Sequence, residues 1–155
     1  MPPYVQVEEG KGIGGLPWYS EYGFQQTRGF RALKTWMSLA HAGRSGMRAT
    51  VSRANDLARL LAQRIEAHPK LELVSEPALS IVCFRYVLTN ALLDVNAVNK
   101  SLMERLQASG DAFVTQAVIG DAFALRANIL HRGTTEHDLD AFFEAVVRIG
   151  DHLDS

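Results

Sequence analysis

The stretch AFALRANIL, residues 122–130, alternates between two kinds of side chain, as a β-strand with one buried face does. One side of such a strand would carry Phe123, Leu125, Ala127 and Ile129, and the other Ala124, Arg126, Asn128 and Leu130. If the first side packs on helices, Arg126 points away from them on a rigid strand. This pattern predicts a strand at 122–130.

The sequence on either side of this strand predicts a small sheet. Gly120-Asp121 joins it to a second strand at 112–119, which indicates a hairpin. Two further strands are expected at 71–74 and 80–86, separated by the turn-prone Glu76-Pro77.

Four helices are expected around these strands. A helical pattern from Thr27 stops at Gly43, and a second one, with Met47, Val51 and Leu61 on one stripe, ends before Pro69. A third helix runs from a cap at Asp94 to Gly110, and Thr135 with Asp138 forms a capping box that opens the last. The order of elements predicts an α+β fold, a small antiparallel sheet with helices on one face.

Composition excludes several classes of function. The 155 residues carry a net charge of −1 and contain 47% hydrophobic residues, so we expect neither a nucleic-acid nor a membrane partner. The single cysteine, Cys83, lies in a hydrophobic run and is interpreted as a buried thiol. Together with the lack of a signal-peptide pattern at Met1-Pro2-Pro3-Tyr4, this indicates a cytoplasmic protein.

Residues 1–26 differ from the rest, because glycines and prolines interrupt any helical or strand period. A segment this long without regular structure is typical of a functional loop or a linker. We therefore predict two parts, a mobile loop and linker at 1–26 and a domain at 27–155.

Two residues are candidates for chemistry. Arg126 is either an ordinary arginine on a solvated sheet face or a receptor that pairs with a carboxylate through two hydrogen bonds. Tyr4 is either an incidental loop tyrosine or a lid contact that donates a proton. The histidines and Cys83 show no metal-ligand spacing, so no metal is expected.

Several stretches, in order, resemble the group II pyridoxal-phosphate-dependent amino-acid decarboxylases, and in particular their aromatic-L-amino-acid members. They are TRGFRALKTW (27–36), AHAGRSGM (40–47), LSIVCFRY (79–86), LRANIL (125–130) and TTEHDLDA (134–141). The resemblance implies the C-terminal small domain of a homodimeric enzyme whose large domain, missing here, binds most of the pyridoxal phosphate. It also implies that the parent enzyme converts an amino acid, with aromatic ones preferred, to an amine and carbon dioxide.

The resemblance assigns roles to individual residues. Tyr4 would be the loop tyrosine that protonates the substrate carbon after carbon dioxide leaves, and Arg126 would lie near the substrate carboxylate. Arg28 matches an arginine for which a structural role is expected, whereas Gly29 stands where many members have a second arginine.

The lysines do not match the cofactor motif of the family. None of the four lysines, Lys11, Lys34, Lys70 and Lys100, follows a histidine as the Schiff-base lysine does there. We therefore expect this chain to be inactive alone. The alternatives are a non-catalytic interaction module and another pyridoxal-phosphate enzyme of the same fold.

Overall fold

The computed structural model describes residue 24 and residues 29–155. The chain divides into two compact units, one ending at Gly43 and the other spanning Arg44–Ser155, and each is described by itself. Tyr4, Arg28 and the predicted boundary between residues 26 and 27 lie outside the described residues. Within the described ranges, no helix is both long enough and hydrophobic enough to cross a membrane.

The first two predicted helices form one element, α1 (Arg31–Glu66), with a kink at Gly43. Gly43 has φ 62° and ψ 178°, a backbone conformation that is open almost only to glycine. The helix resumes at Arg44, so Gly43 interrupts the helix without a connecting loop. In the first unit the helix exposes large hydrophobic side chains, among them Trp36 and Met37.

The second unit contains a four-stranded antiparallel sheet, as predicted. Its strands are β1 (Leu71–Leu73), β2 (Ile81–Tyr86), β3 (Thr115–Ile119) and β4 (Ala122–Asn128), in the order β1-β2-β4-β3. Gly120 has φ 61°, which a two-residue hairpin between β3 and β4 requires. β4 pairs with β2 on one side and with β3 on the other.

All four strands are shorter than predicted, and β3 differs most. It begins at Thr115 rather than at residue 112, because the preceding Val114 turns into the core and its carbonyl accepts a hydrogen bond from Gln107 Nε2 at 2.6 Å. A side chain of the helix α2 (Val95–Ser109) therefore takes the place of a partner strand at this point.

The predicted caps of the other two helices are present. Asp94 caps α2 (Val95–Ser109) by accepting from the amides of Asn96 and Ala97, and Gly110 ends the helix in a left-handed conformation. Thr135 and Asp138 form the capping box at the start of α3 (Glu136–Asp154).

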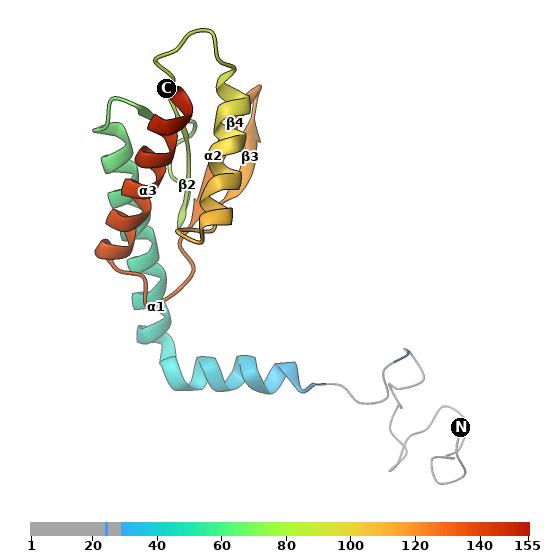
Figure 1. Cartoon of the computed structure of the whole chain (residues 1–155). Coiled ribbons are helices and arrows are strands. Elements are labelled where there is room, and N and C mark those ends of the chain that lie inside the picture. Colours follow the sequence, from blue (N-terminus) through green and yellow to red (C-terminus); the bar gives the residue numbers. More distant parts are fainter. Residues whose placement is uncertain (1–23, 25–28) are drawn as a thin grey trace, which may run out of the picture. The chain divides into compact units, whose positions relative to one another are not determined.

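The helices of the second unit lie together on one face of the sheet, which confirms the predicted architecture (Figure 1). The core between the two layers includes Leu61, Ile65, Phe84, Leu102, Leu125 and Val146, all at most 1% exposed. The predicted inward stripe on α1 is only partly correct. Leu57 to Ile65 lie in the core, but Met47 and Val51 are exposed, because they belong to the turns of α1 before it reaches the sheet.

Polar contacts tie the sheet to the helices. The fully buried Asn99 of α2 accepts from the amide of Tyr86 at 2.7 Å and donates to its carbonyl at 2.9 Å. Near the end of α3, Asp154 accepts from the amides of Thr89 and Asn90 and from the Thr89 hydroxyl. These three donors hold the pKa of Asp154 below its usual value and fasten α3 to the loop after β2.

Candidate functional site

The side of the sheet that points away from the helices of the second unit, here called the outer sheet face, carries the residue singled out from the sequence. In β2 and β4 the core residues alternate with side chains on this face, as a pleated strand requires. The face consists of Glu72, Ile81, Cys83, Arg85, Thr115, Ala117, Ile119, Ala122, Ala124, Arg126 and Asn128.

Arg126 lies near the middle of the outer sheet face and is half-buried. In the register it stands between Cys83 on β2 and Thr115 on β3. Within the described part of the chain, its side chain makes one hydrogen bond, in which Nη1 donates to the Thr115 hydroxyl at 3.5 Å. No carboxylate among residues 24 and 29–155 pairs with this guanidinium, which leaves its donors available to an anion.

A second arginine on this face has a partner, and the sequence argument missed the pair. Arg85 Nε donates to Glu72, which stands directly opposite it in the register of β1 and β2. The sequence indicates that Glu72 and Arg85 point away from the core, because each alternates with hydrophobic residues in its predicted strand. The register between the strands was not available from the sequence.

Two small residues, Cys83 and Ala124, occupy the positions between the two arginines on this face. Cys83 is 8% exposed and Ala124 is fully buried, although no helix of the second unit covers them. The longer side chains around them therefore cover these positions. Cys83 is buried, as predicted from its hydrophobic surroundings.

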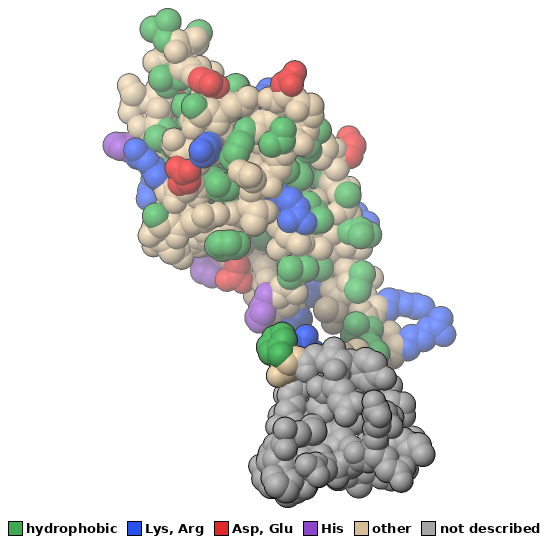
Figure 2. Space-filling view, turned by 90° about the vertical axis from the view of Figure 1, so that its right-hand side faces the viewer, with side chains coloured by type: hydrophobic (Ala, Val, Ile, Leu, Met, Phe, Trp, Pro, Cys, Tyr) green, Lys and Arg blue, Asp and Glu red, His purple; other side chains and the backbone are tan. Residues whose placement is uncertain are grey.

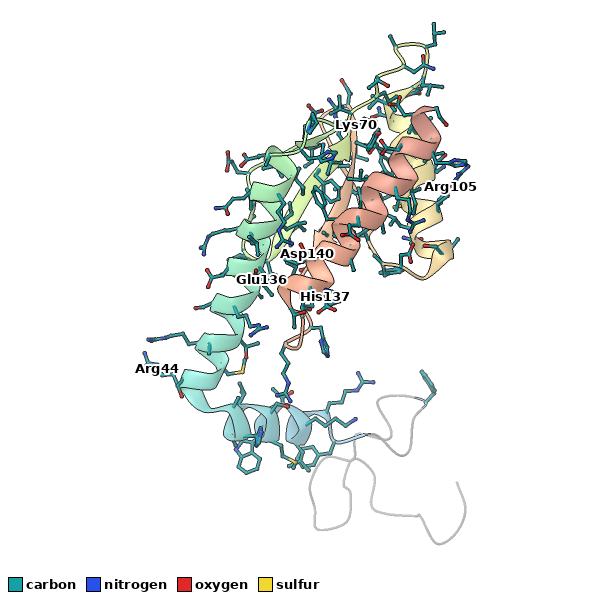
Figure 3. All side chains as sticks on the ribbon, turned by 60° about the vertical axis from the view of Figure 1, so that its left-hand side comes forward. Arg44, Lys70, Arg105, Glu136, His137 and Asp140 are labelled. Atoms are coloured by element: carbon teal, nitrogen blue, oxygen red, sulfur yellow. The ribbon has the colours of Figure 1, made fainter. Side chains whose placement is uncertain are left out.

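The described lysines do not fit a pyridoxal phosphate site. A Schiff base needs a lysine that can lose its proton, whereas the Lys70 ammonium lies 2.5 Å from Asp151 (Figure 3). The hydrogen bond to Asp151 raises the pKa of Lys70 well above its usual value, so the amine stays protonated. Lys34 and Lys100 are exposed on α1 and α2. The described residues therefore lack an amine with this role.

Lys70 belongs instead to a structural cluster with Tyr86 and Asp151. The Tyr86 hydroxyl donates to Asp151 Oδ1 at 2.6 Å, and Lys70 lies over the tyrosine ring, 5.9 Å from its centre. Burial, with the bond to Asp151, raises the pKa of Tyr86 to about 12. The two donors lower the pKa of Asp151, so the cluster holds one negative and one positive charge at neutral pH.

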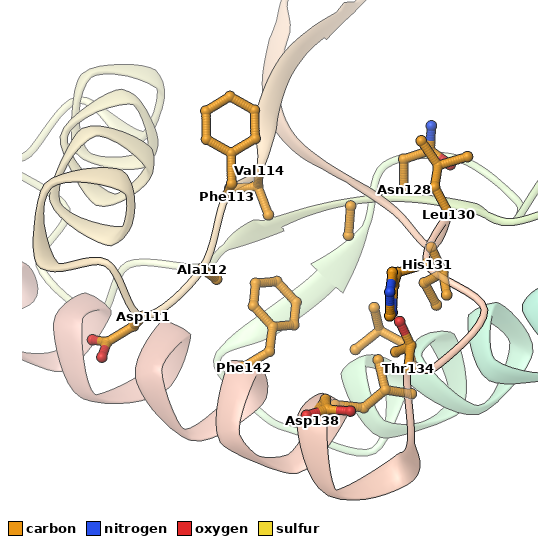
Figure 4. Close-up of a pocket in the computed structure, with 14 residues that line it drawn as sticks. Asp111, Ala112, Phe113, Val114, Asn128, Leu130, His131, Thr134, Asp138 and Phe142 are labelled. Atoms are coloured by element: carbon orange, nitrogen blue, oxygen red, sulfur yellow. The ribbon is translucent and has the colours of Figure 1, made fainter.

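A cavity of about 380 Å³ lies elsewhere, between the helix layer and the ends of the strands (Figure 4). Its floor is hydrophobic, with Val114, Ile129 and Phe142, and His131 and Asp138 stand at its edge. Asp138 is already engaged by Thr135 in the capping box, and His131 Nδ1 accepts from the amide of Gly133. Arg126 does not line this cavity, so the two features are separate.

Metal-ligand clusters are absent from the described residues, since no three His, Cys, Asp or Glu side chains come together there. Of the two candidate site residues, Arg126 lies in the described part of the chain. Tyr4, the other one, lies outside the described residues.

A family model described as the pyridoxal-dependent decarboxylase conserved domain matches residues 4–87, which is more than half of the chain. The chain belongs to the pyridoxal-dependent decarboxylase family. This confirms the resemblance inferred from the sequence motifs.

Curated relatives of this chain are much longer than it is. An aromatic-L-amino-acid decarboxylase of Catharanthus roseus is 25% identical over 126 residues, which cover 81% of this chain and 25% of that protein. One of Drosophila melanogaster is 28% identical over 141 residues, covering 91% and 26%. A phenylacetaldehyde synthase of a Rosa hybrid cultivar is 29% identical over 143 residues, covering 86% and 27%. The chain thus spans about a quarter of the length of these relatives.

Solved structures of family members share the fold. The structure of Oryza sativa TDC with PLP and tryptamine aligns with a TM-score of 0.75 at 24% identity, covering 92% of this chain and 31% of that one. Catharanthus roseus tryptophan decarboxylase in complex with L-tryptophan gives 0.73 at 24% identity, covering 86% and 29%. The α+β small domain of the family is therefore present here.

Proposed function

We propose that this chain is the C-terminal part of a pyridoxal-phosphate-dependent carboxy-lyase that converts an amino acid to an amine and carbon dioxide. Membership of the decarboxylase family supports the reaction class. The observation that carries the proposal for this chain is the guanidinium of Arg126, which projects from a rigid strand without a carboxylate partner in the described residues.

Arg126 receives a carboxylate of the substrate in this proposal. Its planar guanidinium offers paired N–H donors that match the two oxygens of a carboxylate. The bond to Thr115 engages one end of the fork and leaves the other end free. Arg126 would therefore orient the substrate through a charge-assisted pair.

Tyr4 donates the proton that replaces the carboxylate on the substrate carbon. When the carbon–carbon bond breaks, carbon dioxide leaves and the carbon takes up one proton, so that an amine results. A phenol is a suitable donor when the loop that carries it also excludes water from the reacting atoms.

The cofactor is held mainly by a large domain outside this chain, through which the enzyme forms a homodimer. Pyridoxal phosphate supplies the electron sink for such a decarboxylation when it is bound. Because the described lysines do not fit it, we expect this chain to be inactive alone. Aromatic amino acids are the proposed substrates, in keeping with the relatives named aromatic-L-amino-acid decarboxylase. The cytoplasm is the proposed location, because the single cysteine and the first residues show no pattern typical of a secreted protein.

The test compares this chain alone with the same chain joined to the sequence encoded upstream. Each protein is incubated with pyridoxal phosphate and then with L-tryptophan, L-tyrosine or L-glutamate. We expect the visible absorbance of lysine-bound cofactor, carbon dioxide and an amine only from the longer protein, and most from the aromatic substrates. Aldehyde is measured in parallel, because one relative is a phenylacetaldehyde synthase.

Two variants of the longer protein separate the roles. Tyr4→Phe should keep cofactor absorbance and substrate binding but lose most of the amine product, because the proton donor is gone. Arg126→Gln should raise KM for the amino acid. A longer protein that binds the cofactor but only transaminates, or a short chain that is active by itself, would contradict the proposal.

An interaction module is the second candidate, favoured by the hydrophobic side chains that the first unit exposes. Phe30 and Trp36 are 69% and 66% exposed on or beside α1. On the face shown in Figure 2, hydrophobic side chains are instead dispersed among charged ones. Size-exclusion chromatography with pull-down distinguishes the candidates, since a clean monomer with one defined partner favours the module and concentration-dependent aggregation favours a part of a larger enzyme.

A further inference from the structure

The outer sheet face carries two arginines close to each other, and their surroundings differ. Cys83 pairs with Arg126 in the register of β2 and β4, and Arg85 follows Cys83 by two residues on the same face. The two arginines are therefore diagonal neighbours, a relation that places main-chain positions about 7–8 Å apart. Two acidic groups joined by a few carbon atoms could therefore span the two arginines.

Only one of these arginines is neutralised within the described residues. Arg85 donates to the carboxylate of Glu72, its direct cross-strand partner, and the two side chains are 29% and 43% exposed. Arg126 has only the 3.5 Å contact with the Thr115 hydroxyl. The face thus presents one compensated cation and one uncompensated cation.

We propose that Glu72 blocks Arg85 as a second anion site, so that the outer sheet face accepts one carboxylate per ligand and disfavours dicarboxylates. This inference rests on the proposed role of Arg126. A second carboxylate that approached Arg85 would meet the negative charge of Glu72 and would have to displace it. An uncharged substituent would bring no second negative charge near Glu72. Glu72 is therefore a residue that determines specificity without touching the reacting atoms.

The test uses this chain as it stands and two simple probes at constant ionic strength. Butyrate carries one carboxylate, and glutarate carries two at a separation of three methylene groups. Binding is followed through the arginine Nε–Hε signals in ¹H–¹⁵N spectra, which report each guanidinium separately. In the unchanged chain we expect both probes to shift Arg126, butyrate with the higher affinity, and both to leave Arg85 unshifted.

The decisive variant is Glu72→Gln, which removes the charge and keeps the shape. This change should raise the affinity for glutarate roughly tenfold, because one charge-assisted hydrogen bond to Arg85 is added. The affinity for butyrate should stay unchanged. Glu104→Gln is the matched control, because it removes the same charge from an exposed position on α2. The double change Glu72→Gln with Arg85→Gln should abolish the gain.

The outcomes separate this inference from the proposed function. Butyrate binding that is absent, or that survives Arg126→Gln, would refute the carboxylate site at Arg126 and this inference with it. Butyrate binding that depends on Arg126, combined with an unchanged ratio of glutarate to butyrate affinity in Glu72→Gln, would overturn this inference alone. Circular dichroism of each variant checks that the fold is retained.

Discussion

Asn99 is a buried amide whose three hydrogen bonds all go to the backbone. It accepts from the Tyr86 amide and donates to the carbonyls of Tyr86 and Val95, and so joins α2 to β2 where the strand ends. A buried backbone group that loses its partner costs about 1–3 kcal/mol. Asn99 therefore stabilises the fold by giving buried backbone groups hydrogen-bond partners that they would otherwise lack.

We predict that Asn99→Leu lowers the free energy of unfolding by about 2–4 kcal/mol, because the Tyr86 amide and carbonyl both lose a partner. Urea unfolding followed by circular dichroism measures this loss. Lys100→Leu changes the adjacent exposed position and should alter stability by less than about 0.5 kcal/mol. Equal effects of the two changes would show that the amide is not a structural tie.

Gly150 lies where α3 crosses the ring of Tyr86. A Cβ atom at this position would overlap the ring carbons, which are buried and cannot move aside freely. The absence of a side chain thus allows the helix to approach the strand closely.

Gly150→Ala should destabilise the protein by about 1–3 kcal/mol through overpacking, despite the better helix propensity of alanine. Differential scanning calorimetry would detect the lower Tm. At Gly29 an added Cβ meets nothing within 4 Å, so Gly29→Ala serves as the control and should leave Tm almost unchanged. A Gly150→Ala protein as stable as the parent would contradict this packing.

The helical backbone of α1 is interrupted at Gly43 by the conformation of that one residue. Alanine reaches φ 62° with ψ 178° only at a cost of about 1–3 kcal/mol, whereas the helical conformation is open to it. The kink therefore depends on glycine at this position.

We expect Gly43→Ala to convert residues 42–44 to helical backbone, which ¹³Cα chemical shifts would report directly. Gly46→Ala, three residues further along α1, should strengthen the helix and leave the shifts at 42–44 unchanged. Non-helical shifts in both variants would mean that contacts outside this residue impose the kink.

The sequence predicted these elements well where the signal was local. Thr135 and Asp138, Asp94, and Gly110 lie at the predicted helix ends, because capping depends on residues a few positions apart. The alternation in β4 placed Arg126 on the correct side of the sheet.

Features that depend on distant residues could not be predicted in the same way. The pairing of Glu72 with Arg85 requires the register of β1 and β2, and the short β3 follows from a side chain of α2. The exposure of Met47 and Val51 depends on where α1 meets the sheet, which no periodicity reports.

Carboxylates engaged across the molecule make the stability of the fold depend on pH. Asp111, Asp138, Asp151 and Asp154 each accept hydrogen bonds that lower the pKa below the ordinary value of 3.8. A carboxyl with a lowered pKa in the folded state contributes its full stabilisation above the unfolded pKa. That contribution is lost as pH falls through the folded pKa.

We therefore expect the urea midpoint to be constant from about pH 7 to pH 5 and to fall progressively below about pH 4. Asp154→Asn should lower the midpoint at neutral pH and make its decline in acid shallower, since one of the four groups no longer titrates. Asp56→Asn, at an exposed i,i+3 pair on α1, is the control and should leave the profile unchanged. An acid profile that is the same in Asp154→Asn and in the parent would contradict the role given to this carboxylate.

The position of β4 between two partner strands has a consequence for ligand recognition. Its main-chain groups are bonded on both sides, so the amide of Arg126 should be among the slowest in the chain to exchange with solvent deuterium. An anion that binds there meets a framework that is already ordered, and saturation with butyrate should leave the exchange rates of β4 almost unchanged.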